Sequence, residues 1–149
     1  MTFMNENYQQ YKAMYDAATQ HNKAAVVDAL TAASITTLTA EFDGYGDSGQ
    51  IESITAQAGD SVVELPKTAI TIRVVTNVRR GDHDETIEKV EQQPLAEAIE
   101  VLCYDYLEER HGGWEINDGS FGRFEFDVTS RIVTLEFTQR SSDFSSEEF

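Results

Sequence analysis

The stretch RFEFDVTSRIVTLEF, residues 123–137, decides the fold of this chain. Apolar side chains alternate with polar ones on both sides of a short Thr129-Ser130 step. The apolar positions are Phe124, Phe126, Val128, Val133, Leu135 and Phe137. Alternation with a period of two places every second side chain on the same face of a strand. The stretch therefore predicts a β-hairpin with one buried face, turning at Thr129-Ser130.

A helix is predicted before this hairpin, in PLAEAIEVLCYDYLEER, residues 94–110. Pro94 suits a helix start, apolar residues follow at helical spacing, and Gly112-Gly113 ends the pattern. Acidic residues occupy the predicted outer face: Glu97, Glu100, Asp105, Glu108 and Glu109. The composition of this face indicates a surface for a basic partner, although a merely solvated helix would look the same.

The first third of the chain also predicts helix followed by hairpin. In residues 4–19, Tyr8, Tyr11, Met14 (with Tyr15) and Ala18 recur at helical steps, and this stripe is expected to face the core. Asn22 then either caps a second helix or lies in a continuation to about residue 33. Strands are expected over 35–43, 51–57 and 68–78, while 85–92 is ambiguous between helix and strand.

Together these elements predict an α+β two-layer sandwich in the order α-β-β-β-α-β-β. An antiparallel sheet of four to five strands, including two hairpins, would be covered on one face by the helices. Residues 1–140 are expected to form a single domain. Residues 141–149 (SSDFSSEEF) are expected to form an acidic, polar tail.

The charge balance narrows the classes of partner. The chain has 27 acidic and 11 basic residues, a formal net charge of −16. A negative charge of this size repels nucleic acid and acidic membranes and attracts basic proteins.

The cysteine content and the lack of targeting signals bear on the compartment. The single cysteine, Cys103, cannot form an intramolecular disulfide, and no signal peptide or membrane span is recognisable. We therefore expect a cytoplasmic protein that contacts neither nucleic acid nor membrane directly.

Two stretches combine glycine with aspartate, FDGYGDSGQI at 42–51 and HGGWEINDGSFGRFEFD at 111–127. Both are longer than a simple turn requires, so we expect them to converge into a ligand or partner site. The candidate residues are Asp43, Asp47, Ser48, Trp114, Glu115, Asn117 and Asp118. A divalent cation could bind where Asp43 or Asp47 meets Glu115, Asp118 or Asp127, although the spacing is not that of an EF-hand. Turn chemistry alone is the alternative explanation.

FDGYGDSGQIE, and later PLAEAIEVLCYDYLEERHGGWEINDGSFGRFEFDV, resemble a family of small acidic proteins of unknown function from bacteria and their mobile elements. The resemblance covers roughly residues 23–57 and 94–149. It implies the architecture and the importance of both loops, but no activity, cofactor or ligand set.

The function that the sequence favours is a non-enzymatic acidic interaction module. Residues 82–109 hold ten acidic residues against one lysine, which suits docking on a basic, nucleic-acid-binding protein or mimicry of a nucleic acid. The alternative is a small enzyme or a cation- or ligand-binding domain that uses the two glycine- and aspartate-rich loops.

Overall fold

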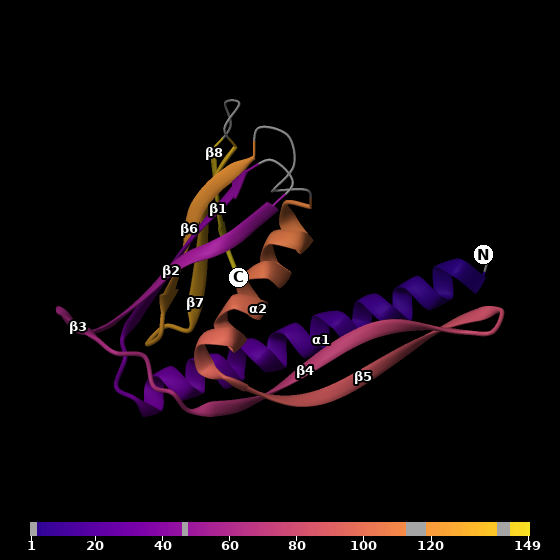
Figure 1. Cartoon of the computed structure of the whole chain (residues 1–149), viewed down its shortest axis with the longest axis horizontal. Coiled ribbons are helices and arrows are strands. Elements are labelled where there is room, and N and C mark those ends of the chain that lie inside the picture. The colour runs from indigo at the N-terminus through magenta and orange to yellow at the C-terminus, as the bar shows by residue number, and fades with distance from the viewer. Residues whose placement is uncertain (1–2, 46–47, 113–118, 140–143) are drawn as a thin grey trace.

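The computed structural model describes residues 3–45, 48–112, 119–139 and 144–149, and it shows an α+β fold (Figure 1). Within these ranges the elements follow in the order α-β-β-β-β-β-α-β-β-β. Their bounds are α1 Phe3–Ala32, β1 Thr37–Tyr45, β2 Ser48–Ala58, β3 Ser61–Val63, β4 Ala69–Arg80, β5 His83–Pro94, α2 Leu95–Arg110, β6 Ser120–Asp127, β7 Ile132–Gln139 and β8 Phe144–Glu148.

The main sheet is antiparallel and has the strand order β3-β2-β1-β6-β7-β8. β1 and β6 pair at its centre, where Leu38 lies opposite Phe126, and they join two three-stranded meanders. The predicted count of four to five strands is wrong, because six strands form this sheet. β3 has only three residues, and β8 comes from the stretch expected to be a tail. Both are edge strands, which need less apolar surface than central strands do.

Helix α2 covers one face of this sheet and lies between the sheet and α1 (Figure 1). The ring centroids of Tyr106 and Phe124 are 6.1 Å apart, and the Ile51 N–H donates a hydrogen bond of 2.9 Å to the Tyr104 hydroxyl. The alternating apolar residues of β6 and β7 face this layer, as the sequence predicted. Phe124 and Phe126 are fully buried, which stabilises the fold by about 1.5–3 kcal/mol for each side chain.

A separate two-stranded ribbon, β4 and β5, runs along α1 (Figure 1). The third predicted strand, 68–78, is confirmed as β4, but it lies outside the main sheet. The ambiguous stretch 85–92 belongs to its partner, β5. Gly81, at a φ of 63°, opens the two-residue turn between them. Ile72 and Val75 of β4 are buried, whereas β5 has no buried residue, and for this reason its sequence carries no clear alternation.

Helix α1 runs without a break from Phe3 to Ala32, so the first predicted helix does continue to about residue 33. The alternative prediction, a second helix capped by Asn22, is wrong. Asn22 lies inside the helix, only 2% exposed, and binds the main chain of β4. Its Nδ2 donates to the Arg73 carbonyl at 2.9 Å, and the Arg73 N–H donates to its Oδ1 at 2.8 Å. Asn22 thus ties the ribbon to α1. In the described part of the chain, neither helix is long and apolar enough to cross a membrane.

Candidate functional site

The glycine- and aspartate-rich stretches meet the sheet at one end of its central strand pair. Gly44 of β1 lies opposite Ser120 of β6, and Asp43 lies opposite Phe121. The described ends of the two stretches are therefore neighbours. The other predicted ligands lie outside the described residues, namely Asp47, Trp114, Glu115, Asn117, Asp118 and the side chain of Ser48. Convergence of those side chains stays a prediction.

Asp43 lines a hollow of about 290 Å³ together with Glu41, Glu52 and Phe121. Asp127 lies six residues beyond Phe121 along β6. At about 3.3 Å per residue this separates Asp43 from Asp127 by roughly 20 Å, so the two cannot share a cation. Among the residues that the structure describes, no three His, Cys, Asp or Glu side chains are grouped to hold a metal ion.

The predicted acidic face of α2 is divided in the structure. Glu97, Glu108 and Glu109 are exposed, and Glu100 is partly exposed. Asp105, predicted on the same outer face, instead turns toward α1, where its Oδ1 accepts a hydrogen bond of 2.8 Å from the Tyr15 hydroxyl. The difference arises because α2 contacts α1 as well as the core, which leaves only part of its circumference in solvent.

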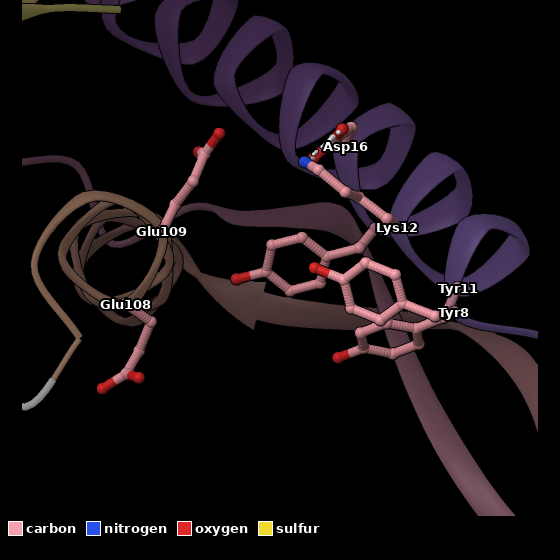
Figure 2. A pocket seen from close by; sticks show the side chains of 7 residues that line it. Tyr8, Tyr11, Lys12, Asp16, Glu108 and Glu109 are labelled. Carbon is pink, nitrogen blue, oxygen red and sulfur yellow. Dashed lines mark hydrogen bonds and ion pairs between the residues drawn. The ribbon is translucent and has the colours of Figure 1, made fainter. Parts of the chain in front are cut away.

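A cavity of about 460 Å³ lies between the first turns of α1 and the last turn of α2 (Figure 2). We call it the tyrosine cleft. Its lining residues are Tyr8, Tyr11, Lys12, Tyr15 and Asp16 of α1, and Glu108 and Glu109 of α2. Figure 2 shows the rings of Tyr8 and Tyr11 side by side, with the two glutamates across from them on α2, where their side chains point to opposite sides of the helix. The sequence stripe therefore lines a cavity here, instead of the core that it predicted.

The exposure of the rings explains why the core prediction failed. Tyr8 is 64% exposed, Tyr11 and Tyr15 are partly exposed, and only Ala18 of the predicted stripe is buried. The Tyr11 and Tyr15 ring centroids are 5.9 Å apart. One signal was present in the sequence: the stripe consists of tyrosines, whose hydroxyls require polar surroundings, whereas core stripes are commonly leucine or phenylalanine.

The cleft carries an excess of negative charge. Its lining has three carboxylates against the single ammonium of Lys12. Lys12 Nζ lies 3.1 Å from Asp16 Oδ2, in an ion pair open to solvent that contributes little to stability. Within the described part of the chain, neither Glu108 nor Glu109 has a hydrogen-bond or ion-pair partner. Two carboxylates therefore remain to interact with a ligand.

Behind Tyr15, the Asp105 carboxyl is held in a poorly solvated position. The pKa of Asp105 is raised from 3.8 to about 6, chiefly by burial. The hydrogen bond from Tyr15 opposes this rise, and the charges of Glu108 and Glu109 contribute to it. Burial and the nearby Asp105 also raise the pKa of the Tyr15 hydroxyl. At neutral pH the ionised Asp105 lowers the stability of the fold, and a cation bound nearby would offset that cost.

This combination of groups can bind a cation. Tyrosine ring faces attract ammonium and guanidinium groups within about 6 Å of the ring centroid. Carboxylates on the opposite wall supply charge-assisted hydrogen bonds. The site is thus built from two segments far apart in the sequence, which meet because α1 and α2 pack against each other.

A family model described as a family of unknown function (DUF6878) matches residues 18–149. The chain belongs to this family. The resemblance to a family of unknown function is confirmed at this level. No curated protein and no solved structure matches the chain. The DUF6878 match includes every strand and α2, whereas Tyr8, Tyr11, Lys12, Tyr15 and Asp16 of the tyrosine cleft precede it.

Proposed function

We propose that this DUF6878 protein is a non-enzymatic acidic interaction module that docks on a basic protein surface. The observation that carries the proposal is the tyrosine cleft, where aromatic rings lie beside two carboxylates without a partner among the described residues. Tyrosines are common anchors of protein interfaces because they bury a large area at little entropic cost. The net charge of −16 adds long-range attraction toward a basic protein.

The partner that suits this charge best is a protein that binds DNA or RNA, because such proteins present basic surfaces to phosphates. An acidic protein on that surface competes with the nucleic acid and so acts as a mimic or an inhibitor.

The test is affinity capture from cells that express the protein, followed by binding measurements with each purified partner. We expect a basic nucleic-acid-binding protein whose affinity falls at least about tenfold between low and high salt and which releases the module when duplex DNA or RNA is added. Changing Glu97, Glu100, Glu108 and Glu109 together to Gln should weaken the complex. The proposal would be overturned if the affinity did not fall as the salt concentration rose, or if the quadruple variant bound as tightly as the wild type.

A further inference from the structure

We infer that the tyrosine cleft is a socket for one arginine side chain of the basic partner. This inference rests on the proposed function and narrows it to a contact. The guanidinium group lies against the rings of Tyr8 and Tyr11 and hydrogen-bonds to the carboxylate of Glu108 or Glu109.

The dimensions and the walls of the cleft fit such an occupant. A volume of about 460 Å³ is within the usual range of pockets, about 300–1,000 Å³, and exceeds the need of a metal ion. The aromatic wall comes from α1 and the acidic residues come from α2, where Glu108 and Glu109 point to opposite sides of the helix (Figure 2). A cation on the rings is therefore reached by one of these exposed carboxylates when its side chain turns toward the cleft. A long side chain entering from a partner can reach this position while its backbone stays outside.

Arginine suits the cleft better than lysine. Its planar guanidinium stacks on aromatic rings, is only weakly hydrated and offers two parallel N–H donors to a single carboxylate. A lysine ammonium is strongly hydrated and can use the ring faces less well. The cleft also contains its own lysine, Lys12, which is paired with Asp16 at 3.1 Å. Lys12 interacts with Glu109 only through longer-range attraction, so neither glutamate is in an ion pair with it.

The charge of the cleft argues against a nucleotide as occupant. Aromatic side chains that stack on bases normally lie in basic grooves that bind the phosphates. Here the lining holds three carboxylates against one ammonium, and this excess of negative charge repels a phosphate. The rings are therefore available for a cation instead of a base.

The experiment titrates the full chain with the blocked peptide acetyl-Gly-Arg-Gly-amide and follows the ring resonances of Tyr8 and Tyr11 by NMR. We expect weak, saturable binding with shifts concentrated on these rings. The citrulline peptide, which has nearly the same shape but no charge, should not bind. Equal binding of the citrulline peptide, tighter binding of the lysine peptide, or shifts spread evenly over the acidic surface would each overturn the inference.

Two double variants that remove the same charge distinguish binding in the tyrosine cleft from general attraction to the acidic protein. Glu108→Gln with Glu109→Gln should weaken peptide binding about fivefold, whereas Glu97→Gln with Glu100→Gln, on the same helix, should change it less than about twofold. If both pairs weaken binding equally, the socket is refuted, while salt-dependent docking of the whole protein still stands.

The tyrosine rings are tested in the same way. Tyr8→Leu with Tyr11→Leu should weaken binding about threefold, and the corresponding Phe changes should preserve it. Circular dichroism of every variant checks that it is folded.

Discussion

The two halves of α1 belong to one continuous helix but have different surroundings. From Ala18 onward the helix sends Val26, Val27 and Leu30 into the core, all at most 1% exposed. From Tyr8 to Ala17 no side chain is buried, and tyrosines face the cleft. The DUF6878 match begins at residue 18, where the buried half starts. The comparison teaches that one half of this helix stabilises the fold, while the other half lines the tyrosine cleft and contributes no buried side chain from Tyr8 to Ala17.

The ribbon explains how the exposed half can stay helical. A helix segment of this length is marginal in water unless something packs on it. β4 and β5 run beside α1, and the two hydrogen bonds between Asn22 and the Arg73 main chain hold the ribbon in place. We therefore expect the ribbon to support the tyrosine cleft indirectly, by fixing the helix that carries its rings.

The largest expected effect is in the buried half. Leu30→Ala removes a fully buried side chain and should lower the free energy of unfolding by about 2–5 kcal/mol, because it leaves a cavity in the core. Met14→Ala, in the half that faces the cleft, should cost less than about 1 kcal/mol, since Met14 is partly exposed. Urea unfolding of both variants measures this contrast. Equal losses would break the division of α1 into two halves.

The next largest effect concerns the two hydrogen bonds that join Asn22 of α1 to the Arg73 main chain of the ribbon. Asn22→Leu leaves the Arg73 N–H and C=O without their partner and should cost about 2–4 kcal/mol, with faster hydrogen exchange of the β4 and β5 amides. Thr31→Val is the control, because it removes a side-chain hydrogen bond to the Val27 carbonyl that lies within α1 itself. If ribbon exchange is unchanged in Asn22→Leu, the ribbon does not depend on this bond.

A third prediction concerns pH and the contact between the two helices. Because the pKa of Asp105 is about 6 in the folded state and 3.8 ordinarily, the folded state retains a proton that the unfolded state loses. Its contribution to stability is complete below about pH 4 and is lost as the pH rises through about 6. Asp105→Asn should therefore be more stable than the wild type above pH 6, by roughly 1–3 kcal/mol, with little difference near pH 4.

Urea unfolding at several pH values between about 4 and 8 measures this difference. Glu97→Gln removes one exposed carboxylate from the same helix and controls for the change in net charge. If Asp105→Asn destabilises the protein equally at every pH, then the hydrogen bond to Tyr15 outweighs the cost of burying the carboxylate.

The smallest expected effect on stability is at the start of the helix. Tyr8→Leu should change the free energy of unfolding by no more than about 0.5 kcal/mol, because the ring is 64% exposed. Arginine-peptide binding should nevertheless fall, since the outer ring of the cleft is gone. Thermal melts measure the stability of this variant, and the NMR titration measures its affinity for the arginine peptide. A large loss of stability would contradict this division of α1, because Tyr8 would then stabilise the fold as the buried half of the helix does.

The elements that depend on local pattern could be predicted from the sequence. The helix expected over 94–110 forms over Leu95–Arg110, and the hairpin expected around Thr129-Ser130 forms from β6 and β7. Both are fixed by periodicity, by a proline or glycine at an end, and by a buried face. β5 and β8 lack that signal, because β5 has no buried residue and none of the four β8 side chains from Ser145 to Glu148 is buried.

The sequence by itself determined the acidic charge, the antiparallel hairpins and the α+β class, because these follow from composition and from patterns within a few residues of one another. Only the tertiary structure placed β6 beside β1, joined Asn22 to Arg73, and turned Asp105 toward Tyr15 across 90 residues of sequence. Only packing also decided that the tyrosine stripe would line a cleft. The physical reason is that periodicity shows which side of an element an apolar or polar side chain occupies, while its partner depends on which distant element covers that side.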